Sequence, residues 1–350
     1  MKALMKVAKG PGHFEVRDIP VPEVRKPDDV LIRVRYAGIC GTDVHIYHDA
    51  FQNYPPVVLG HEFSGVVEAV GDGVTGFKPG DRVVAEPHTR FCGKCDVCRA
   101  GKIQLCRQKR SPGWGIDGAF ADYLVMPELF LHRIPDGVSD RIAALAEPLA
   151  IVTHEVLERG IVEPQDTVAV IGAGPIGLLA AVAAKAGGAG RTIVIGTDAD
   201  EAVRFPAARK LGVDFILNGQ RVDAVAEVLS LTGGKGADMA VEASGSEGGI
   251  NTAIDVLRVC GRLTAVGMPG KDRVAVQWLK MIQKVLDVKF NLSSSVSSWE
   301  RALGIMATTA ADLSAVISHE MHIEDWELAF ERIARGEAIK VLFVPGRAKS

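Results

Sequence analysis

The spacing of hydrophobic residues changes along the chain. Up to about residue 150, apolar residues fall in short β-branched runs, such as Val30–Tyr36 and Ser64–Val70, separated by glycine, proline and aspartate. After Pro164, short apolar runs alternate with longer alanine- and leucine-rich stretches that have a helical period. The first region therefore predicts an irregular β-rich domain, and the second predicts strands that alternate with helices.

The second region has the pattern of a doubly wound α/β sheet. We expect its strands at Thr167–Ile171, Thr192–Ile195, Ala237–Glu242 and Arg262–Val266, with a helix running to Ala186 after the first of them. Strands that alternate with helices form a parallel sheet with helices on both faces. The last stretch contains helical patterns and ends in the strand-like run Lys340–Val344, which periodicity alone does not assign to either domain.

Composition narrows the class of protein. The chain has 350 residues, enough for two domains, with 47% hydrophobic and 24% charged residues, as in ordinary globular proteins. Its 40 Lys and Arg against 43 Asp and Glu give a net charge of −3, so no basic surface for nucleic acid is expected. Neither a secretory leader nor a membrane span is expected, because Met1–Gly10 has no long apolar core and the apolar stretch Ile176–Ala184 ends at Lys185. We expect a cytoplasmic protein.

Four of the six cysteines form a tight cluster. They follow the spacing Cys92-x2-Cys95-x2-Cys98-x7-Cys106. Four thiolates in one loop suit tetrahedral Zn²⁺, and a site with all four positions filled is structural. Unrelated loop cysteines and an iron–sulfur cluster are the alternatives.

A glycine-rich turn follows the first strand of the second region. Gly172-x-Gly174-x2-Gly177 comes between a predicted strand and a predicted helix, which is the context that a dinucleotide site requires. The glycines allow a tight turn, a close approach to the pyrophosphate and close helix packing. Pro175 and Ile176 begin the helix, whose N-terminus attracts phosphate.

Three further candidate metal ligands lie far apart in sequence. They are Cys40 in Gly38–Asp43, His61 in Gly60-His61-Glu62, and Glu147 before Pro148. Each alone has an ordinary explanation, since a single cysteine is usually a small core residue and a single histidine usually a hydrogen-bonded polar residue. Their spacing does not establish a site.

Taken in order, these motifs resemble those of the zinc-containing medium-chain alcohol dehydrogenase family, over essentially the whole chain. Within it, the sequence is similar to the polyol (sorbitol-type) and threonine dehydrogenase branch. The motifs that carry the resemblance are Gly38–His45, Gly60-His61-Glu62, Pro79–Val83, the four-cysteine loop, Glu147-Pro148-Leu149 and Gly172–Gly177.

The resemblance implies a fold and an assembly. It implies a GroES-like β-rich catalytic domain over 1–150, to which 291–350 returns, and a Rossmann dinucleotide-binding domain over 151–290. It also implies a homodimer or homotetramer that acts on a small alcohol. Two zinc ions per chain are expected, one structural and one catalytic.

The resemblance also implies roles for single residues. Cys40, His61 and Glu147 match the catalytic zinc ligands, while Glu62 matches a residue that binds the metal directly or through water, so the third ligand stays open between the two glutamates. A zinc ion with three protein ligands keeps a position for substrate and acts as a Lewis acid on the alcohol. Thr42 and His45 match positions from which a proton relay leads to solvent.

The cofactor prediction depends on the end of the second strand. An acidic residue about 20 positions after the last glycine binds the adenosine ribose in NAD enzymes, and Asp198 follows Gly177 by 21 residues. Gly196 would fill this slot if the preceding turn did not absorb the shift, and Arg204 could then help to bind the phosphate of NADP. A carboxylate at Asp198 would repel that phosphate, so we predict NAD, with NADP as the alternative.

Three functions follow from these observations. The first is hydride transfer from a secondary alcohol, expected to be a polyol or sugar alcohol, to NAD. The second is an L-threonine 3-dehydrogenase-like activity. The third is a zinc-stabilised dinucleotide-binding protein without enzyme activity, which the candidate ligands Cys40, His61 and Glu147 disfavour.

Overall fold

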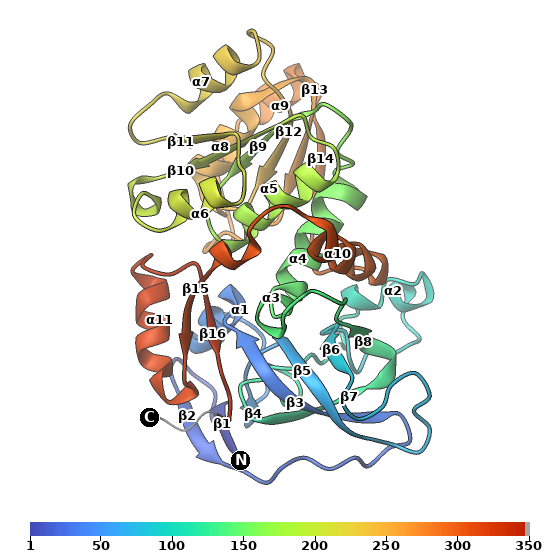
Figure 1. Cartoon of the computed structure of the whole chain (residues 1–350). Coiled ribbons are helices and arrows are strands. Elements are labelled where there is room, and N and C mark those ends of the chain that lie inside the picture. Colours follow the sequence, from blue (N-terminus) through green and yellow to red (C-terminus); the bar gives the residue numbers. More distant parts are fainter. Residues whose placement is uncertain (347–350) are drawn as a thin grey trace. The chain divides into compact units, whose positions relative to one another are not determined.

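The computed structural model describes residues 1–346, which divide into two compact units (Figure 1). Unit 1 consists of Met1–Glu147 together with the chain from Ile317 onward, and unit 2 consists of Pro148–Val316. The boundary at Glu147 falls inside one helix, α4 (Ala146–Thr153). Among the described residues, no helix is both long and apolar enough to cross a bilayer.

Unit 1 is rich in antiparallel strands. Its strands are β1 (Lys2–Lys6), β2 (Phe14–Asp18), β3 (Asp29–Gly38), β4 (Val57–Val58), β5 (Glu62–Val70), β6 (Arg82–Ala85), β7 (Tyr123–Pro127), β8 (Leu131–Arg133), β15 (Ile317–Met321) and β16 (Lys340–Phe343). Its helices are α1 (Gly41–Tyr47), α2 (Asp96–Arg99), η1 (Ile103–Leu105), η2 (Glu128–Phe130), α3 (Asp140–Ala143), η6 (Ile323–Asp325) and α11 (Trp326–Ala334).

Strand β3 is the centre of this unit. A seven-stranded sheet has the order β15-β16-β3-β5-β6-β8, with β7 paired to the first half of β3, and a smaller sheet has the order β2-β1-β4. Strand β3 alternates buried and less buried residues, such as Val30, Ile32 and Val34, so that one face packs on the core. The C-terminal strand β16 pairs with the last two residues of β3 and so belongs to this sheet.

Unit 2 contains a parallel sheet. Its strands are β9 (Thr167–Ile171), β10 (Arg191–Gly196), β11 (Phe215–Asn218), β12 (Ala237–Glu242), β13 (Leu257–Ala265) and β14 (Asp287–Phe290). Its helices are η3, a π-helix (His154–Arg159), α5 (Pro175–Ala186), η4 (Asp198–Asp200), α6 (Arg204–Lys210), α7 (Ala224–Leu231), α8 (Glu247–Val256), α9 (Trp278–Gln283), α10 (Val296–Thr308) and η5 (Leu313–Val316).

The order of these strands is β11-β10-β9-β12-β13-β14, and each neighbouring pair is parallel. This is the doubly wound order, in which the first strand lies at the switch point where ligands bind outside the carboxyl ends. All five residues of β9 are buried, which explains why its sequence is a continuous apolar run rather than an alternating one.

The structure places the return to unit 1 later than the sequence indicates. Residues 291–316, expected in the first domain, belong to unit 2, and the return begins at Ile317. The reason is local packing: α10 and η5 contact η3, α5 and α6 of unit 2, and the Ser295 and Ser297 hydroxyls donate to the Glu158 carboxylate. Residues 347–350 of the expected segment lie outside the described residues.

Candidate active site

The register between β3 and β5 brings two distant ligand candidates together. In this antiparallel pair, Gly38 lies opposite Glu62. Because the strands run in opposite directions, the residues just after Gly38 lie beside the residues just before Glu62. Cys40 and His61 therefore become neighbours, although they are 21 positions apart in the sequence.

The structure groups Cys40, His61 and Glu62. One ligand atom from each lies within 4.8 Å of the others. His61 and Glu62 are buried, and Cys40 is partly buried. Cys40 also caps helix α1: its backbone N–H donates to the Asp43 carboxylate at 2.9 Å, which holds the cysteine at the start of the helix.

Glu147 lies near this group but outside its 4.8 Å spacing. It occupies the first turn of α4 and is 7% exposed. The pKa of Glu147 is raised to about 7, mainly by burial and in part by Glu62, against the opposing effects of His61 and Lys340. Glu147 thus lies within the electrostatic reach of His61 and Glu62.

The environment of His61 suits a cation. Burial lowers the pKa of His61, but the Cys40 sulfur and the Asp43 and Glu147 carboxyls outweigh it and raise that pKa to about 10. Within the described residues, Nδ1 of His61 and Oδ1 of Asp43 are buried without a hydrogen-bond partner. Sulfur, imidazole and carboxylate donors around one point form a donor set that Zn²⁺ accepts. The residues therefore fit the expected metal.

Glu62 has a partner that the sequence analysis missed. Nζ of Lys340, on the C-terminal strand β16, lies 2.6 Å and 2.9 Å from the two Glu62 carboxylate oxygens. Both side chains are buried. The two residues are 278 positions apart, so no local pattern could indicate the pair.

Thr42 and His45 lie on helix α1, three residues apart, and so share one side of it. Oγ1 of Thr42 lies 3.7 Å from Sγ of Cys40. Both residues are partly exposed. The structure thus places a hydroxyl beside the candidate ligand Cys40 and an imidazole one turn further along.

The four cysteines of the 92–106 loop form a second cluster. Cys92, Cys95, Cys98 and Cys106 have sulfur atoms that all lie within 4.8 Å of one another, and all four are free of disulfides. The Cys92–Cys98 and Cys95–Cys106 sulfur pairs are 3.9 Å and 4.0 Å apart. Sulfurs 2.3 Å from a tetrahedral zinc are about 3.8 Å apart. This spacing suits one ion and fits zinc.

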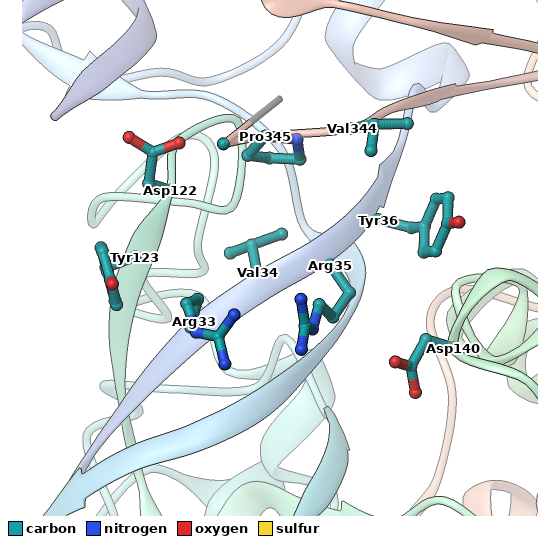
Figure 2. Close-up of a pocket in the computed structure, with 10 residues that line it drawn as sticks. Arg33, Val34, Arg35, Tyr36, Asp122, Tyr123, Asp140, Val344 and Pro345 are labelled. Carbon is teal, nitrogen blue, oxygen red and sulfur yellow. The ribbon is translucent and has the colours of Figure 1, made fainter. Parts of the chain in front are cut away.

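Unit 1 also has a surface hollow whose lining includes none of the candidate metal ligands. It has a volume of about 500 Å³ and is lined by Arg33, Arg35, Asp122, Asp140 and neighbouring residues, none of them a predicted site residue. Figure 2 shows Arg33 and Arg35 extending from the single strand β3. Two arginines and two aspartates leave the hollow without a dominant charge.

The glycine-rich turn joins β9 to α5 in unit 2. Gly172 has φ +105°, and a Cβ on Gly177 would lie 1.9 Å from the Gly172 carbonyl oxygen, so both positions require glycine. At Gly174, a Cβ would meet no atom within 4 Å. The turn therefore leaves open space at the N-terminus of α5, beside Pro175 and Ile176, where a pyrophosphate could approach the backbone.

After β10, the two residues predicted to select the cofactor, Asp198 and Arg204, have hydrogen-bond and ion-pair partners that the sequence did not indicate. Asp198 accepts hydrogen bonds from Asn218 and Arg221, each at 2.7 Å, and these bonds lower its pKa. Arg204, the first residue of α6, instead pairs at 2.8 Å with Asp200, the last residue of η4. The structure thus brings Asp198 together with Asn218 and Arg221, and it holds Arg204 on a different carboxylate.

Two family models match the chain. Residues 26–136 match the alcohol dehydrogenase GroES-like domain, and residues 175–308 match the zinc-binding dehydrogenase model. A sorbitol dehydrogenase from Halalkalibacterium halodurans is 41% identical over 345 residues, which cover 99% of each chain. The chain belongs to the zinc-containing medium-chain alcohol dehydrogenase family.

Other relatives also align with this dehydrogenase over nearly its whole length. An L-threonine 3-dehydrogenase from Francisella tularensis is 37% identical, over 98% of this chain and 99% of that one. The crystal structure of a zinc-binding dehydrogenase from Sinorhizobium meliloti, bound to NADP, is 30% identical with a TM-score of 0.88, over 98% and 99% of the two chains.

The comparisons confirm several predictions. The dehydrogenase has the expected GroES-like and Rossmann-type domains, and it is an oxidoreductase of a zinc-binding family. The alternative of a binding protein without enzyme activity is therefore wrong, because the relatives of this chain are alcohol and sorbitol dehydrogenases. The roles of single residues stay predictions.

Proposed function

We propose that this dehydrogenase oxidises a secondary hydroxyl of a polyol or sugar alcohol and transfers the hydride to NAD. One zinc would be held by Cys40, His61 and Glu147, and a structural zinc by the four-cysteine loop. The observation that carries the proposal is the cluster of the partly buried Cys40 with the buried His61 and Glu62 in unit 1, to which Glu147 lies close enough to raise the pKa of His61. The sorbitol dehydrogenase relative supports a polyol as substrate.

The chemistry divides between metal, chain and cofactor. Zinc in this cluster would act as a Lewis acid that acidifies the bound alcohol, while the nicotinamide accepts the hydride. Oγ1 of Thr42, 3.7 Å from Sγ of Cys40, would accept the proton of the substrate hydroxyl while the threonine passes its own hydroxyl proton on along the relay. His45, on the same side of α1, would receive a proton from this relay and release it to solvent.

A substrate panel tests the proposal. We expect kcat/KM for sorbitol-type polyols to exceed that for ethanol by roughly tenfold or more, because a site with polar groups for extra hydroxyls loses these contacts with a simple alcohol. NADH absorbance provides the measurement, and Cys40→Ala protein provides the blank. A preference for L-threonine would favour the second candidate, which a 37% identical relative motivates, and a preference for ethanol would contradict both.

NAD is proposed over NADP on the charges around Asp198. Arg221 is shared between Asp198, at 2.7 Å, and Glu201, at 3.5 Å. Two carboxylates and one guanidinium leave this position negative, which opposes a 2′-phosphate and suits ribose hydroxyls. Arg204 cannot compensate from its pair with Asp200 without breaking that pair.

Asp198→Ala should change the cofactor preference. Because a hydrogen bond to a charged group contributes about 1.5–3 kcal/mol, the ratio of kcat/KM for NAD over NADP should fall by roughly ten- to a hundredfold. Arg204→Ala is the matched control and should leave the ratio unchanged. A native preference for NADP, or an unchanged ratio in Asp198→Ala, would refute the assignment of Asp198.

We also propose that the dehydrogenase forms a homodimer or a larger homo-oligomer through the β14 edge of unit 2. Strand β14 ends the sheet, and large apolar side chains are exposed around it. They are Val259, Trp278, Leu279, Ile282, Val285, Phe290, Leu292 and Val296. An edge strand with an apolar surround can pair with its own copy about a two-fold axis.

Solution mass tests this assembly. The native protein should have a mass that is a multiple of 37.3 kDa, and Leu279→Asp should lower it because a carboxylate cannot be buried there without a partner. Leu129→Asp, at a similarly exposed leucine of unit 1, is the control. A monomeric native protein would reject the proposal.

A further inference from the structure

A short loop of unit 1 packs directly against the residue that precedes His61. A Cβ on Gly113 would lie 2.9 Å from the backbone nitrogen of Gly60, and a Cβ on Gly118 would lie 2.1 Å from the Gly60 carbonyl oxygen. Both ends of the loop therefore touch Gly60. Trp114 follows Gly113, so the loop carries an indole ring that starts one residue away from this contact.

A second loop, which follows helix α1, brings Tyr54 to the same place. The Tyr54 N–H donates to the Trp114 carbonyl at 2.9 Å, and the centroids of the two rings are 6.3 Å apart. Phe51 of the same loop packs edge to face on Trp114, with the ring centroids 5.8 Å apart. Since α1 begins at Cys40 and the other loop packs on Gly60, the aromatic rings join two segments that lead directly from the candidate site.

Two cations lie around the Tyr54 ring. The guanidinium carbon of Arg110 is 3.8 Å from the ring centroid, and Nζ of Lys9 is 5.9 Å from it. Both distances are within the range of cation–π attraction. A Cβ on Gly115 would lie 2.6 Å from Cδ of Arg110, so the loop that carries Trp114 also packs on the arginine side chain.

Arg110 keeps part of its donor capacity unused. Within residues 1–346 its side chain forms no ion pair, and only Nη1 donates, to the carbonyls of Gln108 at 3.5 Å and Lys109 at 3.1 Å. A guanidinium has five N–H donors in a fixed fork, so three of them remain for a ligand. Such a fork matches the oxygens of a phosphate or a carboxylate.

Lys9 adds a second positive charge beside that of Arg110. Its side chain is exposed, and no hydrogen bond holds it in the part of the chain that the structure describes. Asp49 is an acidic group near it: the pKa of Asp49 is lowered, mainly by a hydrogen bond from Asn53 and less by the charge of Lys9. The two cations outnumber this carboxylate, so the surface here is positive although the whole chain has a net charge of −3.

We propose that Arg110 and Lys9 bind the phosphate group of a phosphorylated polyol whose reacting hydroxyl reaches the Cys40–His61 cluster. The inference rests on the proposed function and narrows it, because the substrate is then a polyol phosphate rather than a neutral polyol. A phosphate monoester carries a charge of about −1.5 to −2 near pH 7 and presents several acceptor oxygens. The Tyr54 ring already orders the guanidinium, so less ordering accompanies binding.

The test compares sorbitol with sorbitol 6-phosphate as substrates of the intact, zinc-loaded dehydrogenase, with NADH absorbance as the readout. The native protein should prefer the phosphate ester in kcat/KM by roughly ten- to a hundredfold, the effect expected of hydrogen bonds between charged groups. Arg110→Met should lower this preference by roughly tenfold or more. The loss should fall mainly on KM for the ester, because the phosphate is bound away from the reacting carbon.

Three further variants separate phosphate recognition from a general effect on the fold. Arg110→Lys should keep part of the preference, since the charge remains and the fork is lost. Lys9→Met removes an exposed side chain and should lower the preference by roughly two- to fivefold, as for an exposed charge. Arg107→Met, at an exposed arginine of the neighbouring loop, is the matched control and should keep the native preference.

The possible failures are distinguishable. Equal kcat/KM for the two compounds in the native protein overturns the inference and leaves the proposed function standing. A native preference for the ester that survives unchanged in both Arg110→Met and Lys9→Met overturns the assignment of these residues. Oxidation of neither compound refutes the proposed function and the inference together.

Discussion

Glu147→Ala should lower turnover by roughly a hundredfold or more, at the upper limit of the effects seen for residues that merely orient metal ligands. In the proposed site Glu147 is the third ligand, so its loss would leave the metal with two protein ligands. A zinc with fewer ligands is released more easily and has more open positions for water.

The measurement pairs kcat with the zinc content of the same preparation. Glu163→Ala, which removes an exposed carboxylate, controls for a general effect of charge, and Glu62→Ala separates the two glutamates. If Glu62→Ala is the more damaging variant, Glu62 is the resting ligand. A Glu147→Ala protein with native activity and native zinc content would exclude the three-ligand site.

Cys95→Ser should remove one zinc per chain and lower the unfolding midpoint by roughly 5 °C or more, a shift that corresponds to a few kcal/mol. A zinc that closes a four-cysteine loop contributes folding free energy directly, because the site does not exist in the unfolded chain. The loop and the Cys40–His61 cluster share no ligand, so the second zinc should stay bound.

Thermal unfolding and metal analysis on one preparation check this expectation. Cys260→Ser is the matched control, since Cys260 is exposed and belongs to neither cluster. It should keep both zinc ions and the native midpoint. Full thermal stability in a Cys95→Ser protein that has lost its zinc would contradict a structural role for the loop.

The features that the sequence predicts well are local. The run Thr167–Ile171 and the glycines of Gly172–Gly177 are consecutive, so their strand, turn and helix follow from neighbouring residues. The four cysteines lie within one loop, so their spacing alone predicts that the sulfurs meet. Such features need no knowledge of how distant segments pair.

The remaining features depend on pairing between distant segments. Cys40 and His61 meet only because Gly38 is opposite Glu62, a register that periodicity does not give. Lys340 reaches Glu62 only because β16 pairs with β3. Lys340 is a basic residue in an otherwise apolar strand-like run from Ile339 to Val344. A lysine in such a run needs a buried partner, and this signal could have indicated one.

Two other residues near the cofactor position escaped prediction for the same reason. Asn218 ends β11 and Arg221 follows it, and β11 lies beside β10 in the parallel sheet, so their side chains meet Asp198 across two strand ends. The sequence pointed instead to Arg204, which begins α6 and pairs with Asp200 at the end of η4, four residues earlier.

The number of zinc ions bound per native chain tests the central claim most directly. The protein has two separate clusters of candidate ligands, the four-cysteine loop and the Cys40–His61 cluster, so metal analysis of the freshly purified protein should give two zinc ions per chain. A value of one zinc per chain, unchanged when zinc is supplied during purification, would contradict the catalytic site and with it the proposed zinc-dependent oxidation.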